Sequence, residues 1–202
     1  MGQFSLFEEP EQEVKLRDGE YIFIQQFFEL EQSNFFFNVL MKETHWKQEY
    51  IKMYGKDIPC PRLMAWYGEQ QSDYTFSGIS LSAEPWTETL LAIKKKVEDK
   101  CETTFNSVLL NLYRNGGDSI SWHADDEKEL GKNPLIASVS FGGARKFKMR
   151  HKYFSDTVSL NLTHGSLLIV KGETQHFWEH EVPKTKKFVE QRINLTFRTI
   201  EK

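Results

Sequence analysis

From residue 106 onward, the chain consists of short apolar runs separated by turn residues. The runs are Val108–Tyr113, Leu135–Phe141, Arg145–Arg150, Val158–Leu162, Ser166–Val170 and Arg192–Ile200. Between them lie Asn115-Gly116-Gly117-Asp118 and Gly142-Gly143, which are typical of tight turns. Many short strands at this spacing indicate a β-sandwich or a jelly roll. We therefore expect a mainly β fold with its core in residues 106–202.

The first hundred residues carry helices and strands that would flank and extend this core. The predicted strands are Tyr21–Ile24, Trp46–Met53 and Arg62–Tyr67, the predicted helices are Ser33–Leu40 and Trp86–Val97, and residues 72–78 are a predicted polar loop. Tyr54-Gly55-Lys56-Asp57 is the predicted turn between the last two of these strands. Residues 1–18 are rich in Glu and offer little to bury, so we expect a flexible tail. Residues 19–202 are expected to form one domain, with helices, hairpin and pocket segment in 19–105 and the β core in 106–202.

Composition limits the class of protein. The chain has 202 residues, 39% of them hydrophobic and 14% aromatic, which is enough for a sizeable core. A net charge of -3 excludes a uniformly basic nucleic-acid binder, so any such contact must use a local basic patch. Cys60 and Cys101 lie far apart, which favours a reducing compartment over a structural zinc site. There is no long apolar run and no signal-peptide pattern, so we expect no membrane partner. We expect a monomer, located in the cytoplasm or, in a eukaryote, in the nucleus.

His123 and Asp125 form a His-x-Asp triplet at the end of an apolar run. Residues two apart on a strand project from the same face, so the imidazole and the carboxylate would converge on one point. A second histidine would complete the two-histidine, one-carboxylate face of non-haem iron sites, which leaves the opposite coordination positions open. The triplet alone is a weak signal, because it also occurs by chance in solvated turns.

Three histidines are candidates for the third ligand: His164, His176 and His180. His164 precedes Gly165 at the start of a predicted strand and is more typical of a turn residue. Spacing along the chain does not choose between His176 and His180.

Arg192 and Arg198 lie on one predicted strand, where residues 192, 194, 196 and 198 share a face. Two guanidiniums buried on the inner face of a barrel would be unfavourable without anionic partners. A dicarboxylate ligand would supply them, since the guanidinium fork matches a carboxylate. The alternative is a pair of surface arginines on an edge strand, because the opposite face is apolar and either face can point inward.

Five motifs then occur in order toward the C-terminus. They are Asn111-Leu112-Tyr113, His123-Ala124-Asp125-Asp126, Ala137-Ser138-Val139-Ser140-Phe141-Gly142, His164-Gly165-Ser166-Leu167-Leu168 and Arg192-Ile193-Asn194-Leu195-Thr196-Phe197-Arg198. Together they resemble the AlkB family of Fe(II)- and 2-oxoglutarate-dependent nucleic-acid dealkylases, from about Tyr21 to the C-terminus. The resemblance implies a double-stranded β-helix core with an N-terminal nucleotide-recognition extension. It makes His123, Asp125 and His180 the catalytic iron ligands, and it places around the cosubstrate Asn111, Tyr113, Arg192, Asn194, Thr196 and Arg198.

Two upstream segments and one acid match the substrate side of the same family. Tyr74-Thr75-Phe76-Ser77-Gly78 resembles the base pocket of the DNA-repair branch, where Phe76 would stack on a flipped base opposite His123. Met53-Tyr54-Gly55 resembles the hairpin finger that fills the gap left by that base. Asp126 would accept a hydrogen bond from the exocyclic amino group of a methylated adenine or cytosine. The plainer interpretations are a core aromatic for Phe76, an ordinary hairpin for the finger and a solvated acid for Asp126.

Two basic stretches are candidates for phosphate contacts on this acidic chain. One contains Arg145, Lys146, Lys148, Arg150 and Lys152, and the other Lys184, Lys186 and Lys187. Alternation places the lysines of the first stretch and Arg150 on one face of a strand. A solvated, purely structural face is the alternative.

The pentapeptide Gln3-Phe4-Ser5-Leu6-Phe7 resembles the short segment by which bacterial proteins dock on the DNA polymerase sliding clamp. Leu6 and Phe7 would enter a hydrophobic pocket, with Gln3 orienting the peptide. The alternative is that the apolar residues of this segment fold back onto the domain.

The resemblance implies oxidative demethylation of N-alkylated bases in DNA, such as 1-methyladenine and 3-methylcytosine. The reaction would use Fe(II), 2-oxoglutarate and O2 and release succinate, CO2 and formaldehyde. The first alternative keeps this chemistry and changes the substrate to tRNA, mRNA or a protein side chain. The second is a non-catalytic nucleic-acid-binding module, which the complete set of ligands and arginines disfavours.

Overall fold

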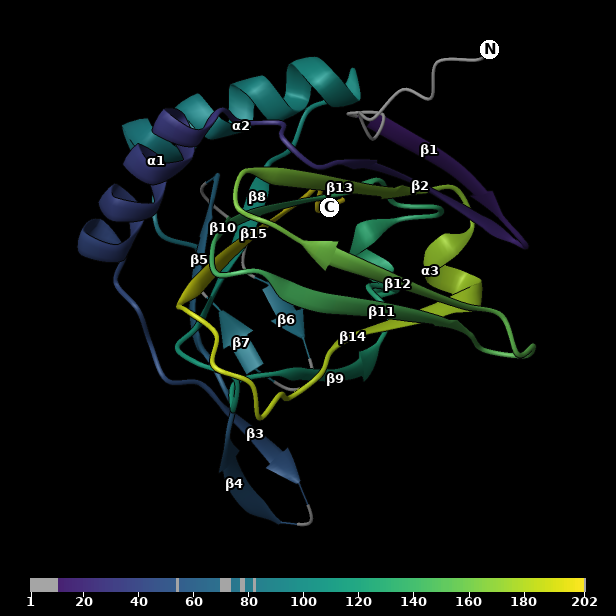
Figure 1. The fold of residues 1–202 in the computed structure, drawn as a ribbon. Helices are drawn as coiled ribbons and strands as arrows, with labels where there is room; N and C mark the ends of the chain where they lie inside the picture. Colours follow the sequence, from purple (N-terminus) through teal and green to yellow (C-terminus); the bar gives the residue numbers. More distant parts are fainter. Residues whose placement is uncertain (1–10, 54, 70–73, 77–78, 82, 202) are drawn as a thin grey trace.

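The computed structural model describes residues 11–53, 55–69, 74–76, 79–81 and 83–201. Its larger sheet has seven strands, all paired antiparallel, in the order β1-β2-β13-β10-β15-β8-β5 (Figure 1). These strands are β1 (Glu11–Leu16), β2 (Gly19–Ile24), β5 (Leu63–Gly68), β8 (Ser107–Tyr113), β10 (Ile136–Gly142), β13 (Ser166–Lys171) and β15 (Arg192–Arg198).

The smaller sheet has four antiparallel strands in the order β12-β11-β14-β9. They are β9 (Ile120–His123), β11 (Arg145–His151), β12 (Thr157–Leu162) and β14 (Trp178–Val182). Strands far apart in sequence are neighbours in both sheets, as in a jelly roll. The predicted mainly β fold with a jelly-roll core and flanking helices is therefore confirmed.

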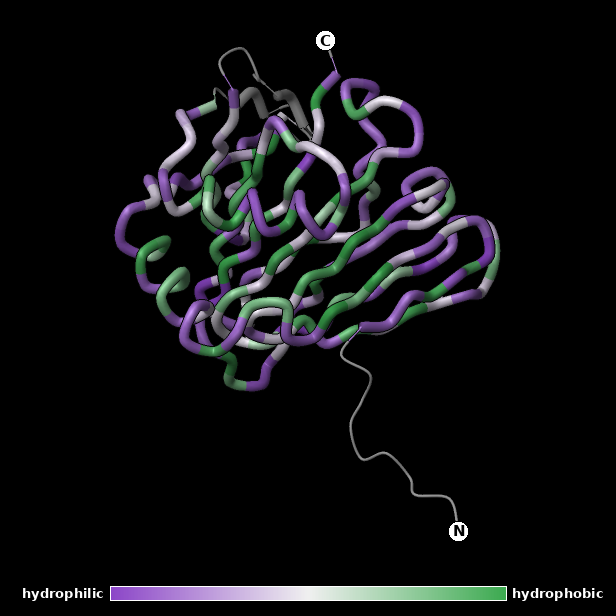
Figure 2. Tube along the Cα trace, turned by 90° about the horizontal axis from the view of Figure 1, so that it is seen from above, coloured by the Kyte–Doolittle hydropathy of each residue, from purple (hydrophilic) through white to green (hydrophobic). Residues whose placement is uncertain are grey.

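Apolar side chains from both sheets fill the space between them. In β11, Phe147 and Met149 are buried whereas Lys146 and Arg150 are exposed, because successive side chains of a strand point to opposite faces. The same cluster includes Tyr21, Phe23, Tyr113, Leu162, Leu168, Val170, Trp178 and Val182. Figure 2 shows hydrophobic stretches running along the strands, with hydrophilic residues concentrated in the outer turns.

Two helices lie together over the larger sheet (Figure 1). The helical elements are α1 (Leu30–Glu43), α2 (Glu88–Cys101), the 3-10 turn η1 (Lys128–Leu130) and the short α3 (Thr174–Phe177). Helix α2 is capped at its N-terminus by Thr87, whose side-chain oxygen accepts a hydrogen bond from the N–H of Leu90. Leu90, Ile93 and Val97 are buried at helical spacing, and burying each contributes about 1.5–3 kcal/mol. Among the described residues, no helix is both long and apolar enough to cross a bilayer.

Short hairpins extend this core. One pairs β3 (Tyr50–Met53) with β4 (Lys56–Pro59) and projects away from the sheets (Figure 1). The other pairs β6 (Tyr74–Phe76) with β7 (Ile79–Leu81). The predicted polar loop over 72–78 is therefore wrong for residues 74–76, which form a strand.

Two further predictions for the N-terminal half are wrong. Glu11–Leu16 is not part of a tail, because this strand pairs along its length with β2; residues 1–10 lie outside the described residues. The prediction that residues 54–57 are the turn between strand 46–53 and strand 62–67 is also wrong, because Lys56 and Asp57 belong to β4, although Lys47 and Met64 form one antiparallel bridge. The hairpin partner of β3 is β4. Every residue of β4 is exposed, so its sequence lacks the alternation of apolar and polar residues by which a strand is recognised.

Candidate metal and cosubstrate site

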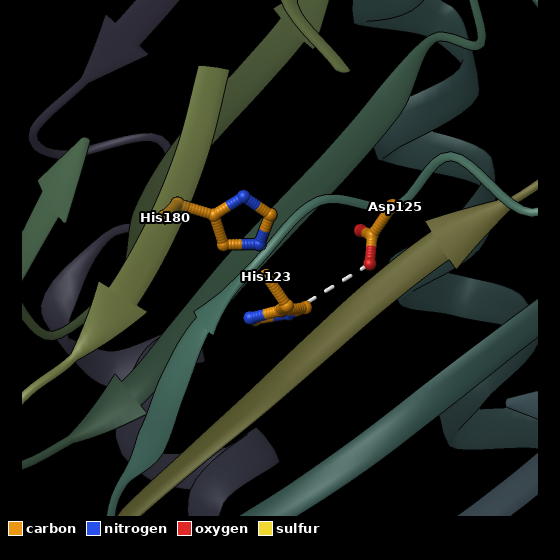
Figure 3. Close-up of side chains that lie close together, drawn as sticks. All are labelled: His123, Asp125 and His180. Atoms are coloured by element: carbon orange, nitrogen blue, oxygen red, sulfur yellow. Dashed lines mark ion pairs between the residues drawn. The ribbon is translucent and has the colours of Figure 1, made fainter. Parts of the chain in front are cut away.

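The side chains of His123, Asp125 and His180 lie close together (Figure 3), beside a cavity lined by residues of both sheets. Their ligand atoms all lie within 4.8 Å of one another. The two histidines are direct cross-strand partners in the β9–β14 pair, with ring centroids 4.2 Å apart. Nε2 of His123 is 3.9 Å from Oδ1 of Asp125. Among the described residues, this is the one cluster of three that can hold a metal ion.

The carboxylate of Asp125 is buried and paired with a buried arginine. Nη2 of Arg198 is 3.0 Å from Oδ2 of Asp125. Burial alone would raise the pKa of Asp125, but the charge of Arg198 and the two imidazoles outweigh it and hold that pKa well below its ordinary value. Asp125 is therefore ionised at neutral pH, as a metal ligand must be.

His180 lies against the apolar ring of Phe147, with ring centroids 5.3 Å apart. Loss of surrounding water lowers the pKa of His180 to about 3, and the neighbouring His123 acts in the same direction. Its imidazole is therefore neutral at physiological pH, with a lone pair available for a metal.

The polar face of β15 points into a cavity of about 60 Å³ beside these ligands. Arg192, Asn194, Thr196 and Arg198 all line this cavity, together with Asn111 and Tyr113 of β8. The apolar residues between them, Ile193, Leu195 and Phe197, belong to the cluster beneath the helices. The structure thus decides which face points inward: both arginines are buried, and the edge-strand alternative is wrong.

Arg192 is 1% exposed and has no acidic partner among the described residues. Its Nη2 donates to Oγ of Ser140 at 2.9 Å, and its guanidinium carbon lies 5.1 Å from the ring centre of Tyr113. Nε and Nη1 are buried without a hydrogen-bond partner in the described part of the chain. Burial lowers the pKa of Arg192 to about 10, so the group stays charged at neutral pH. A buried cation with unused donors, aimed into a cavity, fits an anionic ligand.

The amides around the cavity are held in fixed orientations. Nε of Arg62 donates to Oδ1 of Asn111 at 2.8 Å, and Arg62 is itself buried. The amide nitrogen of Asn194 donates to Oγ of Ser138 at 2.8 Å, and Oδ1 of Asn194 accepts from Thr196 at 3.1 Å. Because its oxygen accepts from Arg62, Asn111 offers other partners the NH2 end of its amide, which is a donor.

The other candidate histidines lie outside the cluster. Nδ1 of His164 accepts from the N–H of Gly142 at 2.7 Å, and Gly165 next to it has φ +78°, as expected for a turn. His176 is exposed on α3, with Nε2 2.8 Å from Oδ1 of Asn133. The geometry therefore selects His180, which spacing alone did not.

The predicted substrate residues are only partly described. Gly55 lies in the β3–β4 turn with φ +75°, and Met53 ends β3. Tyr74 and Phe76 are the ends of β6. Tyr54 and the side chains of Met53, Tyr74 and Phe76 lie outside the described residues. Asp126 is exposed beside the cluster, with Oδ2 3.3 Å from Nζ of Lys152.

The first basic stretch is largely neutralised by neighbouring acids. Arg145 is buried and donates to backbone carbonyls of Asp118 and Pro183, each at 2.8 Å. Three other members form ion pairs, Lys148 with Glu181 at 3.6 Å, Arg150 with Glu179 at 2.7 Å and Lys152 with Asp126 at 3.3 Å, whereas Lys146 is exposed and has no acidic partner among the described residues. This stretch is therefore a weaker candidate for phosphate contacts than its sequence suggests.

Sequence reasoning missed the buried Arg62 and Gln175, and it gave Lys152 only a phosphate role. Oε1 of Gln175 accepts from the N–H of Asp125 at 2.9 Å. Nothing local marks these residues, because Arg62 and Gln175 are 49 and 50 positions from the site residues that they contact.

The residues present fit an iron ion and an anionic cosubstrate. Two imidazoles and a carboxylate are the facial donor set of non-haem Fe(II) sites. His123, Asp125 and His180 would hold the metal, and Arg192 offers unused buried donors to a carboxylate in the adjoining cavity.

Comparison with known proteins agrees with this geometry. A family model described as the 2OG-Fe(II) oxygenase superfamily matches residues 20–198. The chain is 43% identical over 184 residues to alpha-ketoglutarate-dependent dioxygenase alkB homolog 3 of Bos taurus, covering 86% of this chain and 64% of that protein. It is 36% identical over 212 aligned positions to DNA oxidative demethylase ALKBH2 of Arabidopsis thaliana, covering 90% and 67%.

A solved structure, that of OsALKBH1, has the same fold with a TM-score of 0.65 at 18% identity, covering 92% of this chain and all of that one. The chain spans just under two thirds of the length of the alkB homolog 3 proteins that it matches. The family match covers most of the chain, including all three candidate ligands and both buried arginines. The chain therefore belongs to the 2OG-Fe(II) oxygenase superfamily and, within it, to the AlkB family.

Proposed function

We propose that this protein oxidatively demethylates N-alkylated bases in DNA, with 1-methyladenine and 3-methylcytosine as substrates. The observation that carries the proposal is the convergence of His123, Asp125 and His180 beside a cavity that holds the buried Arg192. Relatives named for DNA oxidative demethylation support the choice of substrate. A DNA substrate places the protein in the cytoplasm, or in the nucleus of a eukaryote.

Each part of the site has a proposed task. Bound Fe(II), with 2-oxoglutarate and O2, would supply the oxidising power that hydroxylates the N-alkyl carbon, with succinate and CO2 as by-products. Arg192, Asn111 and the polar face of β15 orient the cosubstrate carboxylates. The apolar walls around Phe147 keep water from the reacting centre. The hydroxylated carbon leaves as formaldehyde and restores the base.

On the substrate side, Asp126 accepts a hydrogen bond from the exocyclic amino group of the damaged base, and Tyr74 and Phe76 form the pocket that receives it. Met53, Tyr54 and Gly55 form the finger that fills the gap in the stack. A methylated base pairs poorly, which lowers the free energy needed to flip it. Lys184, Lys186 and Lys187 remain the best candidates for phosphate contacts, since no acid pairs with them in the described part of the chain.

A panel of methylated oligonucleotides tests this function. With Fe(II), 2-oxoglutarate and O2, we expect loss of methyl groups from 1-methyladenine and 3-methylcytosine in DNA, with one succinate formed per base restored. The measurement is mass spectrometry of the oligonucleotide together with succinate analysis, on single-stranded DNA, duplex DNA and RNA of one sequence. Turnover on RNA alone would replace the DNA proposal with the RNA alternative. Succinate formation without demethylation of any oligonucleotide would exclude both.

We also propose that Gln3–Phe7 docks on a DNA polymerase sliding clamp. The support is the sequence itself, because these residues lie outside the described part of the chain. Deleting residues 1–8 spares β1, which begins at Glu11, so we expect a folded enzyme with unchanged activity on free oligonucleotides and no clamp binding. Surface plasmon resonance on immobilised clamp measures this, with the Leu6→Ala/Phe7→Ala variant as a full-length counterpart. Equal clamp binding by the intact and shortened proteins would refute the docking role.

A further inference from the structure

Gln175 on α3 is a buried polar residue that contacts the backbone of the candidate metal ligand Asp125. It is 2% exposed, and its Oε1 accepts the backbone N–H of Asp125 at 2.9 Å. A buried N–H needs an acceptor, and Asp125 lies in the loop after β9, where no strand partner provides one. The side chain of Gln175 therefore fixes the backbone from which the ligand carboxylate extends.

The backbone of the same residue reaches the neighbouring acid. The carbonyl of Gln175 accepts from Nζ of Lys152 at 3.1 Å, and that ammonium lies 3.3 Å from Oδ2 of Asp126. Lys152 is 21% exposed in its side chain, whereas Asp126 is 50% exposed. The half-exposed carboxylate is thus held by a mostly buried cation that is itself fixed by α3.

Helix α3 is anchored firmly enough to act as a support. Thr174 is 1% exposed, and its hydroxyl donates to the carbonyl of Lys171 at 2.6 Å and accepts from the N–H of Glu20 at 2.9 Å. These bonds tie α3 to β13 and β2 of the larger sheet. Gln175 follows directly, so its position is set by the core of the barrel and not by the loop that carries the ligand.

We propose that Gln175 is a positioning residue for both acids, the metal ligand Asp125 through its side chain and the base-reading Asp126 through Lys152. Lys152 positions only Asp126. The assignment for Asp126 rests on the proposed function, whereas that for Asp125 rests on the metal site alone. Removing a residue that hydrogen-bonds to a metal ligand typically weakens metal binding about 10- to 100-fold.

Gln175→Met tests the first arm, because it keeps the length of the side chain and removes the acceptor. We expect Mn(II), measured by electron paramagnetic resonance of the free ion, to bind about tenfold more weakly than to the wild type. His176→Ala is the matched control on the same helix, since His176 is exposed and touches neither acid, and its Mn(II) affinity is expected to be unchanged. Wild-type Mn(II) affinity in a folded Gln175→Met protein overturns this arm, whatever base the enzyme accepts.

Lys152→Met tests the second arm on the substrate side. We expect unchanged Mn(II) affinity and kcat, and a KM for the methylated oligonucleotide about two- to fivefold higher, as for a part-exposed ion pair. In the Asp126→Ala background, the same change is expected to have no further effect on KM. A KM increase that persists in that background would make Lys152 a phosphate contact and overturn its positioning role. A loss of Mn(II) affinity in Lys152→Met would overturn the separation of the two arms.

Discussion

Replacing His180 with alanine is expected to abolish demethylation and to weaken Mn(II) binding by more than about 100-fold. Removing a residue that only hydrogen-bonds to a metal ligand already weakens metal binding about 10- to 100-fold, and His180 is itself one of the proposed ligands. His180 is the informative choice because burial keeps its imidazole neutral, so its removal leaves no charge behind. Asp125→Ala would also inactivate the site, but it removes the ion-pair partner of the buried Arg198, 3.0 Å away, and so affects folding as well.

The control is His176→Ala, four residues earlier. His176 is the competing ligand by sequence, but its ring lies beside Asn133 and not at the cluster. We expect this variant to keep both metal affinity and turnover. Thermal unfolding of the metal-free proteins checks that both variants fold. If His176→Ala lost the metal and His180→Ala retained it, the ligand assignment would be reversed.

Much of the fold from residue 106 onward was predictable because its strands are short apolar or alternating runs bounded by turn residues. Strands β8 and β15 are buried along their whole length, whereas β11 and β12 alternate between a core face and a more exposed face. In β11, buried Phe147 and Met149 alternate with the more exposed Lys146, Lys148 and Arg150. The missed strands lack this pattern. Strand β4 is exposed throughout and β1 nearly so, so neither buries an apolar face that periodicity can detect.

Strand β14 was missed for a functional reason. Its inward residues are Trp178, His180 and Val182, so the middle position of this face carries the candidate ligand His180 in place of the apolar residue that would have indicated a strand. Functional sites are where local sequence rules are expected to fail.

The site itself was predictable to the extent that its members are close in sequence. His123 and Asp125 are two apart, and the four polar positions of β15 repeat every second residue, so alternation alone aligns each set. Which face of β15 points inward depended on the helices that cover Ile193, Leu195 and Phe197. Arg62 and Gln175 reach the site across large sequence separations, and only the folded chain reveals them.

Arg192→Met is expected to raise the Kd for 2-oxoglutarate by about 30-fold or more without destabilising the protein. Removing one partner of a buried, hydrogen-bonded charge pair costs about 2–5 kcal/mol, and 2 kcal/mol corresponds to about 30-fold. In the ligand-free protein, by contrast, we expect the substitution to leave the stability of the fold unchanged or to raise it. Arg192 is 1% exposed, with Nε and Nη1 lacking a hydrogen-bond partner among the described residues. Replacing a buried charge with an apolar side chain of similar volume is often neutral or stabilising.

Titration calorimetry of 2-oxoglutarate into the Mn(II)-loaded protein, together with thermal unfolding of the ligand-free protein, measures both effects. Lys148→Met is the matched control, because it removes a cation from the outer face of β11, where Lys148 pairs with Glu181. That variant is expected to bind 2-oxoglutarate like the wild type. A lower melting temperature with unchanged cosubstrate affinity in Arg192→Met would mean that Arg192 supports the barrel and does not bind the diacid. We expect the opposite pattern: weaker binding of 2-oxoglutarate together with equal or higher stability. That pattern would mean that the buried guanidinium binds the ligand and does not stabilise the fold.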